Sequence, residues 1–158
     1  MADSGVKAGV YFLRNFGTNT VVDLHEATKV QGWRKRELDD EWVSAQLWII
    51  TPVKDSESEY TIRNAMSRTY LDLEGGSNKS GTPVVGHEGN KHQIHEQRWK
   101  IQPDTETPHT YVIENGQASE TYLDLSKGLA DDGTPLVGHS GTGTDTDNKN
   151  QLWCLDLV

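Results

Sequence analysis

The sequence predicts an all-β fold made of three similar units arranged around a pseudo-threefold axis. Three short motifs recur in the same order three times along the 158 residues, and a fourth recurs in the second and third units. A period near fifty residues is the signature of a repeated structural unit. Each motif is a brief run rich in Val, Ile, Leu, Tyr and Trp, bounded by Gly, Asn, Asp, Ser or Pro, which is typical of a β-strand. No motif reaches helical length, so we expect about four strands in each unit.

The first strand of each unit is expected at the motif Tyr-x-x-x-Asn. Its tyrosines, Tyr11, Tyr60 and Tyr111, lie 49 and 51 residues apart. This spacing recurs in all the other motifs with small changes, which indicates loops of slightly different length between equivalent strands. The motif predicts strands over residues 11–15, 60–64 and 111–115.

The second strand ends on an Asp-Leu pair, and its three aspartates are Asp23, Asp72 and Asp124. The third strand is expected at Gly-Thr-Pro followed by two apolar residues, Gly and His, over residues 81–87 and 133–139. The first unit has Gln-Gly-Trp over residues 31–33 at this point, and then a charged run over residues 34–41. We interpret that run as a solvated loop, with a surface for docking a partner as the alternative.

The fourth strand begins at a closing Gln-x-Trp motif. The three pairs are Gln46 and Trp48, Gln97 and Trp99, and Gln151 and Trp153. No linker separates the units, so we expect a single domain over residues 1–158 with repeats at about 9–53, 58–103 and 109–158. Three copies are too few for the common propellers, which have about 4–8 blades, and an immunoglobulin-like sandwich has no threefold repeat.

Composition restricts the function classes. The formal charge of −9 and the lack of a basic stripe argue against a nucleic-acid partner. No segment approaches the ~20 apolar residues of a membrane span, and the first residues lack the features of a secretion signal. We therefore expect a cytoplasmic protein that does not insert into membranes. Cys154 is the single cysteine, so no internal disulfide forms, and we expect no cofactor.

The three Gln-x-Trp closures, the three Asp-Leu pairs and the fifty-residue period resemble the ricin B-type β-trefoil lectins. Thr-Tyr-Leu-Asp-Leu followed by Gly-Thr-Pro-Val-Val-Gly is similar to the small ricin B-like lectins of mushroom-forming fungi. The resemblance covers roughly residues 9–158 and implies a β-trefoil, in which each repeat gives four strands to a barrel with a hairpin cap. It also implies structural roles for the closing Gln and Trp residues, with Trp48, Trp99 and Trp153 in the core.

The resemblance implies three binding groups in each repeat: the Asp of the Asp-Leu pair, an aromatic ring or His beyond it, and the residue before the closing Gln. Sugar recognition needs an acceptor for adjacent hydroxyls, a flat ring and an amide that both donates and accepts. The third repeat matches at every position, with Asp124, His139 and Asn150. We expect the main site there.

The other two repeats match only in part. The second offers Asp72 and His87, but Glu96 puts a second carboxylate where an amide is wanted. The first offers Asp23 and the ring of Trp33, but Ala45 removes the amide. For each aspartate the alternative is a structural role in a turn, for His139 it is an ordinary loop histidine, and for Trp33 it is loop packing.

We expect a non-catalytic lectin for galactose- or N-acetylgalactosamine-type glycans or glycoproteins, with a homodimer or a second site to raise avidity. The resemblance implies a role in defence. The alternative is a β-trefoil protein-interaction module, either a protease inhibitor or a lectin-like subunit of an enzyme, with degenerate sugar sites. No motif for a nucleophile or a phosphate loop is present, and the three histidines within residues 86–96 match no standard zinc spacing, so we expect no metal.

Overall fold

Short strands and single 3-10 turns make up the chain in the computed structural model, which describes residues 5–54, 56–89 and 95–158. We refer to residues 9–53, 58–103 and 109–158 as repeats one, two and three. Repeat one contains β1 (Gly9–Asn15), β2 (Val21–His25), β3 (Lys29–Trp33) and β4 (Trp48–Pro52). Repeat two contains β5 (Glu59–Asn64), β6 (Tyr70–Leu73), β7 (Thr82–His87) and β8 (Arg98–Pro103). Repeat three contains β9 (Tyr111–Asn115), β10 (Thr121–Leu125), β11 (Thr134–Ser140) and β12 (Trp153–Leu157).

Each closing strand is preceded by a 3-10 turn that ends at the glutamine of the Gln-x-Trp motif. These turns are η1 (Val43–Gln46), η3 (His95–Gln97) and η5 (Lys149–Gln151). Two further turns, η2 (Glu74–Gly76) and η4 (Ser126–Gly128), follow β6 and β10. The prediction of an all-β fold with four strands per repeat is therefore confirmed.

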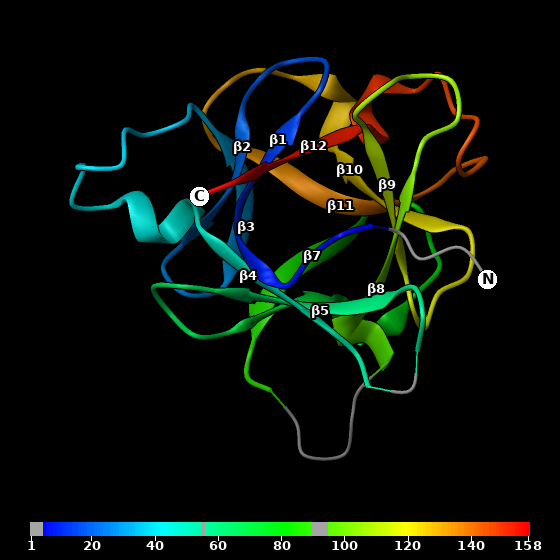
Figure 1. Cartoon of the computed structure of the whole chain (residues 1–158), viewed down its shortest axis with the longest axis horizontal. Coiled ribbons are helices and arrows are strands. Elements are labelled where there is room, and N and C mark those ends of the chain that lie inside the picture. The colour runs from blue at the N-terminus through cyan, green and yellow to red at the C-terminus, as the bar shows by residue number, and fades with distance from the viewer. Residues whose placement is uncertain (1–4, 55, 90–94) are drawn as a thin grey trace.

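Six strands close into a barrel. The pairs β1–β4, β4–β5, β5–β8, β8–β9, β9–β12 and β12–β1 are all antiparallel and return to their starting point. In Figure 1, β1 and β12 lie side by side although they come from opposite ends of the chain. Closure leaves the barrel without a free edge.

The other six strands form three hairpins that cap the barrel. Each hairpin joins neighbouring strands of one repeat, β2–β3, β6–β7 and β10–β11. The second strands of the three hairpins also pair with one another, because β3, β7 and β11 form mutual contacts. The three repeats therefore meet around one pseudo-threefold axis at this cap, and the fold is a β-trefoil.

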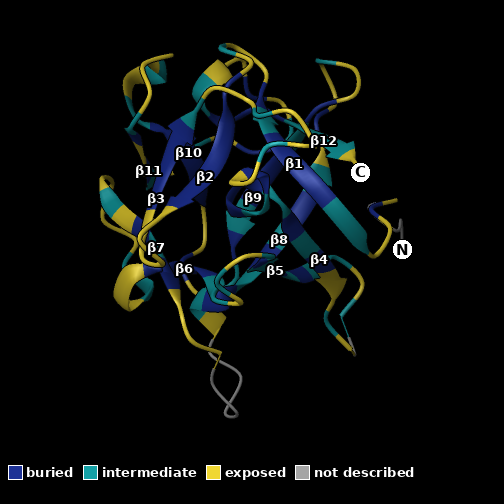
Figure 2. Ribbon diagram, turned by 90° about the vertical axis from the view of Figure 1, so that its left-hand side faces the viewer, coloured by how far each residue is buried: buried dark blue, intermediate teal, exposed yellow. Residues whose placement is uncertain are grey.

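Equivalent apolar residues from the three repeats fill the core. The three closing tryptophans are at most 1% exposed, and Leu13, Ile62 and Ile113 of the opening strands are fully buried. Figure 2 shows this division, with buried residues along the strands and exposed residues in the loops. Three-fold duplication lets a chain with 34% hydrophobic residues bury three large indoles in one core. Among the described residues, no helix has the length and apolarity needed to cross a membrane.

Candidate functional site

The closing tryptophan and glutamine hold the Asp-Leu strand in the same way in every repeat. Each indole Nε1 donates a hydrogen bond to the carbonyl of the residue before the aspartate, with distances of 2.9 Å for Trp48, 2.9 Å for Trp99 and 3.0 Å for Trp153. Each glutamine Nε2 donates to the aspartate carboxylate, at 3.1 Å from Gln46 to Asp23, 2.9 Å from Gln97 to Asp72 and 2.9 Å from Gln151 to Asp124. The motif therefore fixes the carboxylate that the sequence singled out.

The asparagine of Tyr-x-x-x-Asn has a structural role that sequence analysis missed. Its Oδ1 caps the turn after its own strand, and its Nδ2 donates to a carbonyl of the closing turn of the preceding repeat in the cycle. The donor–acceptor distances are 3.1 Å from Asn15 to Lys149, 3.0 Å from Asn64 to Ala45 and 3.0 Å from Asn115 to Glu96. Asparagine recurs at the same motif position in all three repeats, and this recurrence is the sequence feature that could have indicated its structural role.

Repeat three brings its three predicted residues together. Asp124, His139 and Asn150 line one pocket of about 870 Å³. Asp124 is only 3% exposed, and burial raises its pKa, an effect that the Gln151 hydrogen bond and His139 partly oppose. Gln151 occupies Oδ2, and among the residues described no hydrogen bond reaches Oδ1. One oxygen of a fixed carboxylate is thus left to accept hydrogen bonds from a ligand.

The remaining two side chains offer complementary chemistry. Nδ1 of His139 lies 3.1 Å from the carbonyl of Ser140. In the neutral ring, donation from Nδ1 to this carbonyl leaves Nε2 as an acceptor. Asn150 lies in η5 beside Gly128 of η4, where φ is +64° and a Cβ atom would stand 2.5 Å from Asn150 Oδ1. Glycine is therefore required at residue 128 for the amide to lie in this position.

Repeat two holds its aspartate through the same glutamine and tryptophan contacts, but its pocket has more carboxylates. Its pocket, of about 430 Å³, is lined by Asp72, His87 and Glu96, and also by Glu74. Burial raises the pKa of Asp72, the Gln97 hydrogen bond opposes this, and the nearby Glu96 and Glu74 carboxylates raise the pKa further. Acceptors are abundant here, and the amide donor found in repeat three is replaced by a carboxylate.

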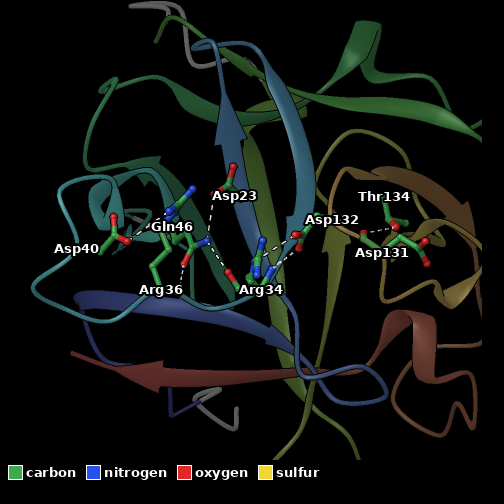
Figure 3. Close-up of polar contacts among 8 residues, drawn as sticks. All are labelled: Asp23, Arg34, Arg36, Asp40, Gln46, Asp131, Asp132 and Thr134. Carbon is green, nitrogen blue, oxygen red and sulfur yellow. Dashed lines mark hydrogen bonds and ion pairs between the residues drawn. The ribbon is translucent and has the colours of Figure 1, made fainter.

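In repeat one, two side-chain amides donate to the two carboxylate oxygens of the aspartate. Asp23 Oδ1 accepts from Nε2 of Gln31 at 3.1 Å, and Oδ2 accepts from Nε2 of Gln46 at 3.1 Å. Gln31 stands opposite Asp23 in the β2–β3 register, whereas Val85 and Val137 stand opposite the other two aspartates. Figure 3 shows Gln46 between Asp23, to which it donates, and Arg34 and Arg36, whose backbone carbonyl and N–H it also contacts. The Gln31 amide, which the other repeats lack, favours a structural role for Asp23. This contact was not expected from the sequence.

The pocket beside Asp23 is lined by a different aromatic residue from Trp33, which the sequence predicts there. By register, Trp33 is equivalent to His87 and His139. However, Trp33 does not line the pocket of about 550 Å³ beside Asp23, where the aromatic residue is Trp42. Trp42 is 55% exposed and comes from the end of the charged loop. The predicted amide position holds Ala45, which lines the same pocket.

The charged loop of repeat one is tied down by its basic residues. The backbone N–H of Arg34 donates to Asp132 of repeat three at 2.9 Å, and its Nε lies 3.2 Å from the same carboxylate (Figure 3). The Lys35 ammonium lies 4.5 Å from the ring centroid of Phe12, and Arg36 pairs with Asp40 at 3.4 Å. The loop is therefore anchored at its start, while its later part presents Trp42.

Within the described ranges, no group of three or more His, Cys, Asp or Glu side chains is placed to hold a metal ion. His92 of the histidine-rich segment lies outside the described residues.

Solved structures with the same fold are numerous, and three illustrate the range. A designed threefold-symmetric protein, ThreeFoil, is 19% identical, with a TM-score of 0.79 over 95% of this chain and 99% of that one. A ricin B-like lectin from Macrolepiota procera, solved with lactose, is 24% identical, with a TM-score of 0.76 over 97% and 99%. A lectin from Polyporus squamosus is 25% identical, with a TM-score of 0.73 over 96% of this chain and 50% of that one.

Comparison with curated protein sequences gives no significant match. The family model of the ricin-type β-trefoil lectin domain-like proteins matches residues 3–87, which is more than half of the chain. That segment contains all of repeat one and the hairpin of repeat two, including Asp23 and Asp72. The chain belongs to the ricin-type β-trefoil lectin domain-like family.

Proposed function

We propose that this protein is a non-catalytic lectin that binds galactose- or N-acetylgalactosamine-type glycans in the repeat-three pocket. The observation that carries the proposal is the convergence of Asp124, His139 and Asn150 on one pocket, with a carboxylate oxygen left open. Repeats one and two are not part of this proposed site. The residue before the closing glutamine is Ala45 in repeat one and Glu96 in repeat two, so neither has the amide that Asn150 provides in repeat three.

The binding mechanism follows from the hydrogen-bonding capacity of these groups. Asp124 Oδ1 accepts from two adjacent sugar hydroxyls, and hydrogen bonds to a charged acceptor are about twice as strong as neutral ones. His139 Nε2 accepts from a third hydroxyl, and the Asn150 amide both donates and accepts. Val137 and Pro135 line the same pocket and can contact an apolar sugar face. No covalent step is involved.

The neighbours with solved structures support a glycan partner. The Macrolepiota procera lectin was solved with lactose, and an earthworm R-type lectin half with N-acetylgalactosamine. Several neighbours are lectins from Macrolepiota, Polyporus and Rhizoctonia, which supports the fungal relationship that we also propose. A role in defence is proposed from the resemblance in sequence alone, and a cytoplasmic location is proposed independently of it. One site per chain binds weakly, so we propose that pairing of two chains raises avidity.

Isothermal titration with lactose and with N-acetylgalactosamine tests the proposal. We expect one site per chain, lost in Asp124→Asn and retained in the matched control Asp72→Asn, because both substitutions replace a buried carboxylate of the same frame. A glycan array on which the folded protein binds nothing contradicts the lectin function. Equal binding by Asp124→Asn and the unmodified protein contradicts the site.

One observation favours a second candidate function, a protein-binding module. Trp42 and Leu38 are 55% and 62% exposed on the loop of repeat one, and exposed aromatic residues are enriched where proteins dock. Titration against papain, trypsin and pepsin separates the two functions. Inhibition of one protease, lost in Trp42→Ala, combined with no sugar binding, favours the interaction module. Sugar binding without inhibition favours the lectin.

A further inference from the structure

The repeat-three pocket is larger than one sugar ring requires. Its volume of about 870 Å³ is twice that of the repeat-two pocket, at about 430 Å³, and pockets of roughly 300–1,000 Å³ enclose ligands of several rings. Asp124, His139 and Asn150 are three of its 17 lining residues. The rest of the pocket is free to hold the continuation of a glycan chain.

The additional wall comes from the other two repeats. β11 pairs with β3 through Thr134 and with β7 through Val137, so the pocket of repeat three continues onto both neighbouring hairpins. Thr28 and Lys29 of repeat one and Pro83 and Val85 of repeat two line it. Figure 2 shows β3, β7 and β11 gathered at this cap. The pocket is therefore a composite of all three repeats.

This pocket carries positive charge in an acidic protein. Lys29 and Lys127 both line it and are both exposed, and neither ammonium group forms an ion pair with a residue in the described ranges. Among the described residues that line it, the single carboxylate is that of Asp124, which accepts a hydrogen bond from Gln151. Two lysines without an ion pair therefore give this pocket local positive charge in a chain of net charge −9.

The adjoining pocket of repeat two has the opposite charge. It shares Thr28 and Val85 with the repeat-three pocket, and its charged lining residues are Asp72, Glu74 and Glu96. A ligand with a negative group is therefore repelled on one side of the shared wall and attracted on the other.

We propose that the repeat-three pocket selects acidic oligosaccharides, with a neutral ring at Asp124 and an anionic substituent of the next position held by Lys29 and Lys127. The shared chemistry is an anionic group on a galactose-terminated core, supplied by either a sialic acid carboxylate or a sulfate ester. This inference rests on the proposed lectin function and adds the ligand class that the site prefers.

Titration with lactose, 3′-sialyllactose, 6′-sialyllactose and 3′-sulfated lactose tests the proposal, at low and high salt. At low salt we expect at least one acidic ligand to bind about fivefold to tenfold more tightly than lactose, since each exposed ion pair adds a few-fold. The ligand that gains shows which anion is recognised. High salt should remove most of the gain, because ions screen exposed charges.

The variants Lys29→Gln and Lys127→Gln should each lose part of that gain and keep the affinity for lactose. Lys54→Gln is the matched control, because Lys54 is exposed and lies outside the pocket. Lactose binding with no preference for any acidic ligand, or a preference that survives both pocket substitutions, overturns this inference and leaves the lectin function standing. Failure of every ligand, lactose included, overturns both.

Discussion

Repeats two and three share most elements of the candidate site and differ in the residue before the closing glutamine. In both, a buried aspartate is held by the closing glutamine, and a histidine donates from Nδ1 to the next carbonyl. The residue before the glutamine is Glu96 in repeat two and Asn150 in repeat three. The Gln-x-Trp contacts are the same in both repeats, and we propose that the adjacent position sets what each repeat can bind.

A further difference follows from how each hairpin meets its neighbours. The repeat-three pocket opens onto Lys29 and Lys127, whereas the repeat-two pocket is lined by Glu74 and Glu96. Two pockets on one scaffold therefore have opposite local charge.

The largest expected effect separates the two aspartates. Asp124→Asn should weaken lactose binding roughly 100-fold, about 3 kcal/mol, because it removes the charged acceptor for two sugar hydroxyls. Asp72→Asn should leave the affinity unchanged. Both variants keep an oxygen that accepts from the closing glutamine, so their thermal unfolding should be similar. Isothermal titration gives the affinities, and equal losses in the two variants contradict the comparison.

A substitution in repeat two should give its pocket the sugar-binding groups of repeat three. Glu96→Asn supplies the missing amide and removes a carboxylate beside Asp72, so the variant should gain a second, weaker lactose site. We expect the apparent stoichiometry to rise from one to two at high ligand concentration. Adding Asp72→Asn to this variant should return it to one site. A stoichiometry that stays at one shows that the amide alone does not distinguish the repeats.

The glycine beside Asn150 should have a smaller effect. Gly128→Ala places a side chain at φ +64° and in collision with the Asn150 amide, so we expect destabilisation of about 1–2 kcal/mol and a several-fold loss of sugar affinity. Gly76→Ala is the matched control in repeat two, with φ +63°. It should destabilise to a similar extent and leave binding intact. Urea unfolding and titration of both variants measure the two effects separately.

The smallest expected effect is on the pKa of Asp72. Glu96→Gln removes a charge that raises the pKa of Asp72, so the pKa of Asp72 should fall while that of Asp124 stays raised. Carbon-13 NMR titration of the carboxyl groups measures both values. A parallel fall at Asp124 would show that the two pockets are electrostatically coupled, which the comparison does not predict.

The same shifts determine how stability depends on pH. Because the pKa of Asp72 and that of Asp124 are raised in the folded state, folded protein binds protons that unfolded chains have released. These two groups therefore add stability as pH falls through their folded pKa values toward the ordinary aspartate value of about 4. Glu96→Gln should reduce this gain on the acidic side.

The repeated parts of the molecule were predictable from the sequence, and the parts specific to one repeat were not. Gln-x-Trp and Asp-Leu recur, so the strands could be inferred from spacing, whereas the buried tryptophans and the grouping of Asp124, His139 and Asn150 were implied by the resemblance to the ricin B-type lectins. Gln31 has no counterpart in the other repeats, and its contact with Asp23 depends on strand register. Trp42 reaches its pocket through an irregular loop that no periodicity describes.

Residues contributed by a different repeat were also beyond sequence reasoning. Lys29 is more than ninety positions from Asp124 in the chain and lines the same pocket only because β11 pairs with β3. A single motif match identifies neither the neighbour nor the side of the hairpin that faces it. The composite wall of the pocket therefore required the three-dimensional arrangement.

A crystal of the unmodified protein soaked with lactose tests the central claim most directly. The account predicts electron density for galactose within hydrogen-bonding distance of Asp124 Oδ1, His139 and Asn150, and none beside Asp23 or Asp72. Density beside Asp23 or Asp72, with the repeat-three pocket empty and open to solvent in the lattice, would contradict it.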